Sequence, residues 1–146
     1  MSDVFIAPEQ LADSRRAGVF RCGGEVAQAA ITTATQQRFT AASLDLAETT
    51  RPGLFTGFAA ALRFPEWFGA NWDALADCLT DLSWLEAPGY LLVLRDATVL
   101  RRRLGQADFD ILVGVLNEAA ANWREQGVPF WVLLENGPSS LPTIVR

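Results

Sequence analysis

The alternation of apolar and polar positions predicts four strands. Two short apolar runs, at 90–94 and 128–134, are bounded by turn residues, as is typical of strands buried on both faces. The segment 39–46 alternates apolar and small residues, and a shorter apolar stretch at 18–22 ends in two glycines. Both patterns favour strands. The hydrophobic pattern therefore predicts a sheet of short strands.

Helical periodicity appears between these strands. Apolar residues recur three and four positions apart, or the composition favours a helix, in five segments: 25–37, 54–62, 71–85, 96–104 and 108–126. Thr50 is the expected N-cap of the second segment, with Pro52 near its first turn, and Gly127 is expected to end the last one. The residues 64–69 contain Pro and Gly and are expected to form a loop.

The order of the elements predicts the fold class. Strands alternate with helices along the chain, which indicates an α/β fold with a small, mainly parallel sheet of three or four strands flanked by helices. No internal repeat or long linker divides the 146 residues. We therefore expect a single domain over 1–146, and free chains are expected to be monomers.

The residue types that are missing exclude several kinds of site. The chain has no histidine and no lysine, so all twelve basic residues are arginine. Without histidine there is no Ser-His or Cys-His nucleophile pair, and the commonest general base and metal ligand are absent. Without lysine there is no Schiff-base chemistry and no phosphate-loop lysine. We therefore expect no enzyme, no metal and no cofactor.

Charge and targeting signals limit the partners and the compartment. The net charge of −5 and the shortness of the only basic run, at 101–103, are unfavourable for nucleic-acid binding, whereas an acidic protein suits a basic protein partner. No apolar run is long enough to span a membrane, and the N-terminus lacks a secretory signal. Cys22 and Cys78 form no CxxC pair and are expected to be free thiols in the cytoplasm.

The segment 64–94 has the most unusual charge pattern. It contains five acidic residues and no basic one, and three of the acids, Asp73, Asp77 and Asp81, are four residues apart. On a helix they occupy a strip about 80° wide, opposite the apolar positions. We call these three residues the acidic strip. Like charges at this spacing cost a helix about 0.2–0.5 kcal/mol per pair, so stability alone does not favour them.

Three interpretations of the acidic strip remain open. It is either a solvated helix face, or a binding surface for a basic pocket, or a general acid and base pair. The neighbouring aromatic residues Trp67 and Phe68 favour the binding surface, because acids beside large aromatics are typical of protein interfaces. Nothing else in the chain supports catalysis, and two carboxylates alone would bind a metal weakly.

The segment 64–80 resembles the signature of the barstar family. Its sequence, FPEWFGANWDALADCLT, has the order Pro-acidic-aromatic-aromatic-Gly-x-Asn-x-Asp-Ala-Leu-x-Asp-Cys-Leu. The resemblance extends more weakly over 39–134. It implies a barstar-like fold with an N-terminal extension over about 1–38, and a protein that inhibits a basic ribonuclease of the extracellular type.

The resemblance also implies which residues bind the partner. Asp77 would meet the arginines of the enzyme's phosphate pocket, with Asp73 one turn earlier, and Trp67 would replace a loop tyrosine that packs on the enzyme. Glu118 would be a second, more loosely matched acidic contact. Four further positions complete the expected binding surface, namely Gly69, Asn71, Ala76 and Thr80.

Two departures from the family pattern concern the target. Ala76 stands where the best-known member has a tryptophan, so one contact is lost, and Asp81 adds a carboxylate to the signature. We expect a ribonuclease inhibitor or immunity protein. The alternative is a barstar-like regulatory module whose partner is not a nuclease.

Overall fold

One or two α-helices separate successive strands in the part of the chain that the structure describes. The computed structural model describes residues 6–45 and 50–144. The strands are β1 (Val19–Cys22), β2 (Thr40–Asp45), β3 (Tyr90–Arg95) and β4 (Phe130–Glu135). The helices are α1 (Pro8–Ala12), α2 (Gly24–Gln36), α3 (Arg51–Leu62), α4 (Trp72–Asp81), α5 (Ala97–Leu104) and α6 (Gln106–Glu125), with a short 3₁₀ helix, η1 (Ser83–Leu85). Across these described residues, no helix is long and apolar enough to cross a membrane.

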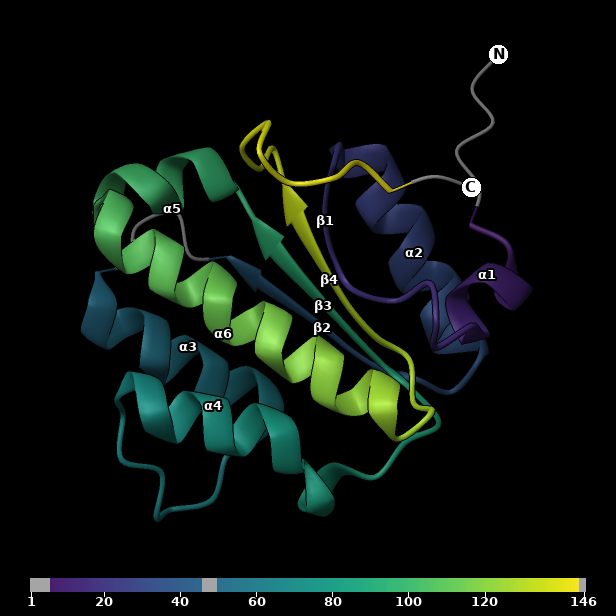
Figure 1. Cartoon of the computed structure of the whole chain (residues 1–146), viewed down its shortest axis with the longest axis horizontal. Coiled ribbons are helices and arrows are strands. Elements are labelled where there is room, and N and C mark those ends of the chain that lie inside the picture. The colour runs from purple at the N-terminus through teal and green to yellow at the C-terminus, as the bar shows by residue number, and fades with distance from the viewer. Residues whose placement is uncertain (1–5, 46–49, 145–146) are drawn as a thin grey trace.

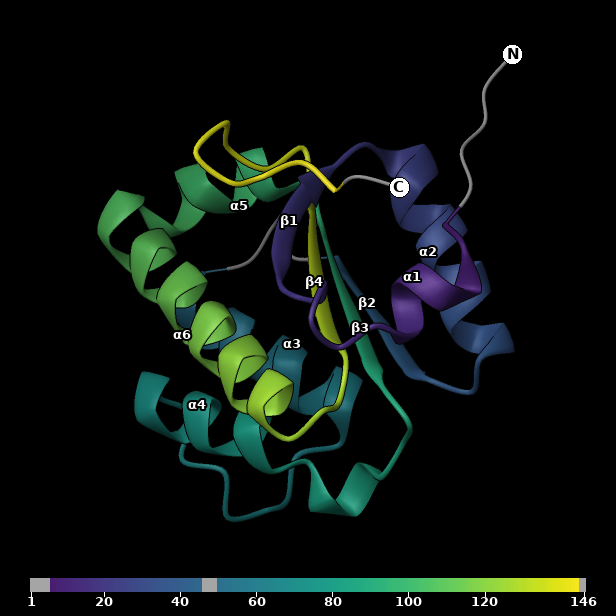
Figure 2. The same ribbon diagram turned by 45° about the vertical axis from the view of Figure 1, so that its right-hand side comes forward.

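The sheet is parallel throughout. Its strand order is β1-β4-β3-β2, and each neighbouring pair runs in the same direction. Helices α3, α4 and α6 cover one face of the sheet and α1 and α2 cover the other (Figures 1 and 2). This arrangement confirms the predicted α/β class and its four-stranded form.

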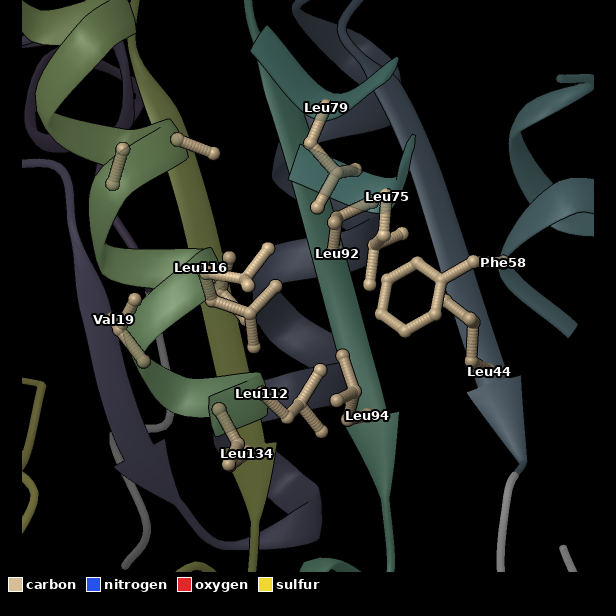
Figure 3. Close-up of a cluster of buried hydrophobic side chains, with 14 of the residues drawn as sticks. Val19, Leu44, Phe58, Leu75, Leu79, Leu92, Leu94, Leu112, Leu116 and Leu134 are labelled. Carbon is tan, nitrogen blue, oxygen red and sulfur yellow. The ribbon is translucent and has the colours of Figure 1, made fainter. Parts of the chain in front are cut away.

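Residues of the two central strands alternate between two cores. On β3 and β4, Leu92, Leu94 and Leu134 point to the layer of α3, α4 and α6, where they meet Phe58, Leu75, Leu79, Leu112 and Leu116 (Figure 3). Val132 belongs to the same buried cluster. Their neighbours Leu91, Val93, Trp131 and Leu133 are buried in the other core, beneath α1 and α2. The continuous apolar runs are explained because both faces of the central strands are covered.

The first part of the chain is built into the sheet and its second core. β1 extends the sheet beyond β4, with Val19 opposite Val132. The Trp131 indole N–H donates to the carbonyl of Leu11 at 2.8 Å, and the Thr33 hydroxyl donates to that of Ile6 at 3.0 Å. The predicted strand at 18–22 is therefore confirmed, and it lies at the sheet edge.

The predicted helix over 71–85 is wrong at its C-terminal end. Helix α4 stops at Asp81 because Leu82 adopts a left-handed conformation, with φ of 49°, and η1 follows. Leu82 is nevertheless buried. The apolar period continues through the break, so it gave no sign of where the helix ends.

Smaller differences occur at other element ends. Thr50 precedes α3 as predicted, but its side chain makes no capping hydrogen bond. Gly127 lies one residue beyond the helix cap, with φ of 74°. The polar tail after β4 is not wholly exposed, since Leu141 and Ile144 are buried and Thr143 forms a parallel bridge with Arg21. Leu46, expected at the end of β2, lies outside the described residues.

Candidate protein-binding surface

Helix α4 begins at a well-formed cap. The side chain of Asn71 accepts a hydrogen bond from the backbone N–H of Ala74 at 2.8 Å, which satisfies one of the free donors of the first turn. Asp73 lies in that turn, where the positive end of the helix dipole favours an anion. Asn71, one of the residues expected on the binding surface, therefore also fixes where α4 starts.

The buried face of α4 orients its acids outward. Leu75, Cys78 and Leu79 are fully buried beneath the helix. Two side chains of α6 fasten its last turn, since Trp123 donates through Nε1 to the Leu79 carbonyl at 2.8 Å and Asn122 donates to the Thr80 carbonyl at 3.3 Å. The helix is thus held as a rigid support for whatever its outer face carries.

The acidic strip is exposed along the whole length of α4. Asp73, Asp77 and Asp81 are all exposed. Within the described part of the chain, the ion pairs are Arg15–Asp13, Arg51–Asp108 and Arg95–Glu135, so none neutralises the strip. Asp81 is the last residue of α4, where the negative end of the dipole disfavours a carboxylate. The strip is therefore a row of exposed carboxylates that no ion pair among the described residues neutralises.

An exposed aromatic side chain stands on the loop before α4. Trp67 is 64% exposed and is the most exposed large apolar side chain of the described residues. Its ring meets that of Trp84 edge-on, with centroids 6.4 Å apart, and Trp84 is held by a 2.9 Å hydrogen bond from its indole N–H to the Leu62 carbonyl. Trp67 is therefore exposed but supported.

The 63–71 loop runs along the length of α4. Trp67 meets Trp84, just beyond the end of α4, whereas Asn71 caps its beginning. The loop lies beside the helix in both Figures 1 and 2. The expected loop residues and the acidic strip consequently belong to one surface.

Gly69 and Ala70 have different roles in the conformation of the 63–71 loop. Ala70 adopts a left-handed conformation, with φ of 52°, as Arg63 does at the start of the loop with φ of 53°, whereas Gly69 has no positive φ. A Cβ at Gly69 would lie 3.3 Å from the Asn71 side-chain nitrogen and would press on the cap. Gly69 thus leaves room for the Asn71 side chain, and the unfavourable left-handed conformation is at Ala70.

The remaining predicted residues, Ala76, Thr80 and Glu118, lie on α4 and α6. Both Ala76 and Thr80 are half-buried, and the Thr80 hydroxyl donates to the carbonyls of Ala76 and Asp77 at 2.9 and 3.2 Å. Glu118 is exposed on α6, one turn before Asn122. Because α4 and α6 run in the same direction (Figures 1 and 2) and Asn122 bonds to Thr80, Glu118 is level with the turn of α4 that holds Ala76 and Asp77.

The cysteine on α4 is not a reactive group. Burial, followed by the charges of Asp77 and Asp81, raises the pKa of the Cys78 thiol. A thiol with a raised pKa carries little thiolate at neutral pH. Among the described residues, no group of three or more Cys, Asp or Glu side chains is placed to hold a metal ion.

Two tryptophans of this surface were not predicted as functional residues. Trp84 supports Trp67, and Trp72 packs edge-on against Phe55 with centroids 5.0 Å apart. Their apolar character was visible in the sequence, but their contacts depend on residues more than fifteen positions away. Only the count of aromatics around 64–84 could have signalled them.

Fold and surface together define a class of small α/β proteins that present carboxylates and an aromatic side chain on a supported helix and loop. The family model described as Barstar (barnase inhibitor) matches residues 39–135, about two thirds of the chain. The chain therefore belongs to the Barstar family, as its signature predicted. The match spans β2 to β4, so α1, β1 and α2 lie outside it. No curated protein matches the chain significantly.

Proposed function

We propose that this protein inhibits a basic ribonuclease by occupying the enzyme's active site. The observation that carries the proposal is the acidic strip, which is exposed, unpaired and mounted on a helix fastened to the core. Membership of a family of barnase inhibitors supports it. Ribonucleases bind phosphates with cationic side chains, which also form charge-assisted hydrogen bonds with carboxylates.

Asp77 is the proposed centre of the contact. It lies in the middle of the strip, so a partner seated on α4 would cover it completely, together with Asp73 one turn earlier. Each carboxylate would replace one phosphate group of the substrate and pair with Arg or Lys. Asp81, at the end of the helix, would lie nearer the rim, where charges contribute less.

Trp67 is the proposed aromatic anchor. Tryptophan is enriched among the residues that dominate binding energy, and an exposed ring covers the rim of a pocket or replaces a stacked base. Trp84 keeps the ring in place before the partner arrives, which reduces the entropy lost on binding. Inhibition by this surface requires occupancy and no chemical step by the inhibitor.

The proposal is tested by titrating the protein into the assay of a barnase-type ribonuclease. Asp77→Asn should weaken inhibition by about 100-fold or more, because a basic group of the enzyme would be buried unpaired. The matched control, Asp81→Asn, removes the same charge from the same helix and should have a much smaller effect. Equal effects of the two substitutions would contradict the central role of Asp77.

A wild-type protein that inhibits no basic ribonuclease would contradict the proposed function itself. The family and the fold would stand, and the alternative of a regulatory module would then be favoured. Co-purification of the chain with a basic nuclease distinguishes the two functions directly. We also propose that the protein acts in the cytoplasm, on the grounds of its two free, buried cysteines.

A further inference from the structure

The outer face of α6 carries a regular stripe of exposed residues. In Figure 1 α6 crosses the side of the molecule nearest the viewer, and no other helix passes in front of it. Successive members of the stripe are four, three, four and three positions apart, the spacing of the contact positions in helices that pair along their length. They are Asp110, Gly114, Asn117, Ala121 and Arg124, and all are exposed. We call them the α6 stripe, and none of them belongs to the acidic strip.

Gly114 leaves open space near the middle of this stripe. Glycine is the least favourable helix residue after proline, yet Gly114 lies well inside the 20-residue α6. Its φ is not positive, so the backbone does not require a glycine there. A Cβ at this position would meet nothing within 4 Å, so the described part of the chain does not need the space either. Together with the small Ala121, Gly114 would let the backbone of another helix come close to α6.

The two ends of the stripe carry opposite charges. Asp110 and Arg124 are about 21 Å apart along the helix axis, and neither belongs to an ion pair among the described residues. The Asp110 carboxylate accepts a hydrogen bond from the Gln106 amide at 2.7 Å and has further acceptor sites. Arg124 donates through one nitrogen to the Ala17 carbonyl at 2.9 Å, which anchors the side chain. Its other N–H groups can pair with a carboxylate.

The stripe is complementary to itself when two copies of α6 lie antiparallel. A two-fold axis at Asn117 places Asp110 level with the partner's Arg124, at both ends of the contact. Gly114 then lies within about 1.5 Å of the level of the partner's Ala121, so small residues face each other. The two Asn117 amides meet on the axis, and each can both donate and accept a hydrogen bond. A parallel arrangement would instead bring like charges together.

We propose that two copies of this protein associate through antiparallel α6 helices. This inference goes beyond the proposed function and does not rest on it. It replaces the monomer that we expected from the sequence. The contact is about four helical turns long and each chain has a net charge of −5, so the dimer should be weak, with a dissociation constant above about 1 μM.

Sedimentation equilibrium of the full chain, from about 1 μM to 1 mM, tests the dimer. The apparent mass should rise with concentration from that of one copy toward that of two. Gly114→Gln introduces a good helix former that fills the space, so it should weaken association by about tenfold or more. The matched control, Ala60→Gln, adds the same side chain at an exposed position of α3 and should associate like wild type. A wild-type mass of one copy over the whole range would overturn the proposal.

Charge reversal tests the antiparallel register. Asp110→Arg alone and Arg124→Asp alone bring like charges together at both ends, so each should be monomeric. An equimolar mixture of the two variants restores both pairs and should dimerise about as strongly as wild type. Folded variants that stay monomeric when mixed, or a wild-type dimer that withstands every substitution, would overturn the proposal.

Urea denaturation shows whether each variant is folded, because Arg124→Asp also loses the hydrogen bond to Ala17. If Arg124→Asp does not fold, the comparison of Gly114→Gln with Ala60→Gln decides the proposal. Weaker association of Gly114→Gln alone supports the α6 contact, and equal association of the two variants overturns it.

Discussion

At the scale of single residues, Asp73 and Asp81 place the same side chain at opposite ends of α4. The helix dipole favours the first and disfavours the second, while both repel Asp77. The outward direction of all three could be predicted from their spacing, because the opposite positions are apolar. The place of Asp73 in the first turn followed from the predicted start at 71. The place of Asp81 as the last residue of the helix could not be predicted, since the break at Leu82 has no Gly or Pro to mark it.

The first prediction concerns the stability of the free protein. Asp81→Asn should raise the free energy of unfolding by about 0.5–1.5 kcal/mol, because it removes both an unfavourable dipole interaction and one repulsive pair. Asp73→Asn is the matched control, and its two effects nearly offset each other, so it should stay within about 0.5 kcal/mol of wild type. Urea denaturation measures both. A loss of stability in Asp81→Asn would show that the carboxylate has a stabilising contact.

The second prediction concerns pH and Cys22. Burial, together with the nearby Glu135 carboxylate, raises the pKa of this thiol from 9.0 to about 11. The unfolded chain releases the proton first, so this contribution to stability is complete below pH 9 and is lost as the pH rises through about 11. The decline should be shallower in Cys22→Ala, measured by urea denaturation across that range. Equal slopes in the two proteins would contradict the raised pKa.

At the scale of elements, the sequence predicted the strands and the centres of most helices, but it did not predict which elements pack or pair with one another. The segment 18–22 predicts a strand from its composition, but nothing in four residues shows that it pairs with β4. Likewise, the indole N–H of Trp84 is satisfied and that of Trp72 is not. The pairing of the strand and the hydrogen bonding of the two indoles both depend on which element packs against them. That is a tertiary property, and the local sequence pattern does not predict it.

The third prediction compares two glycines in different elements. A Cβ at Gly89, just before β3, would lie 2.5 Å from the buried Phe39 ring, so Gly89→Ala should cost about 1–3 kcal/mol. A Cβ at Gly114, exposed within α6, meets nothing within 4 Å, so Gly114→Ala should stabilise the protein by about 0.8–1 kcal/mol. Thermal and urea denaturation test both changes. Destabilisation by Gly114→Ala would indicate that the backbone of α6 is distorted there.

At the scale of the whole molecule, both the layered packing and the net charge affect the acidic strip on α4. The core on the inner side of α4 holds the acidic strip rigidly, while the second core beneath α1 and α2 supports the far face of the sheet. The net charge of −5 extends the field of the strip beyond contact distance. A basic enzyme would therefore be attracted before any side chain touches.

The fourth prediction is that salt slows association with a basic ribonuclease. Steering by opposite charges raises association rates by about 10- to 1,000-fold at low ionic strength, and added salt removes this gain. Stopped-flow measurements at increasing sodium chloride should show a steep fall in the association rate, with a smaller change in the dissociation rate. An association rate that does not respond to salt would exclude the strip from the first encounter.

The central claim is that the acids of α4 take the place of phosphate groups in a ribonuclease active site. It is tested most directly by measuring the affinity of the chain for a barnase-type ribonuclease with and without a saturating mononucleotide. If the claim holds, the nucleotide should lower the apparent affinity in proportion to its occupancy of the site, and Asp77→Asn should bind weakly in both conditions. An affinity that the nucleotide leaves unchanged would show that the two bind different sites and would contradict the account.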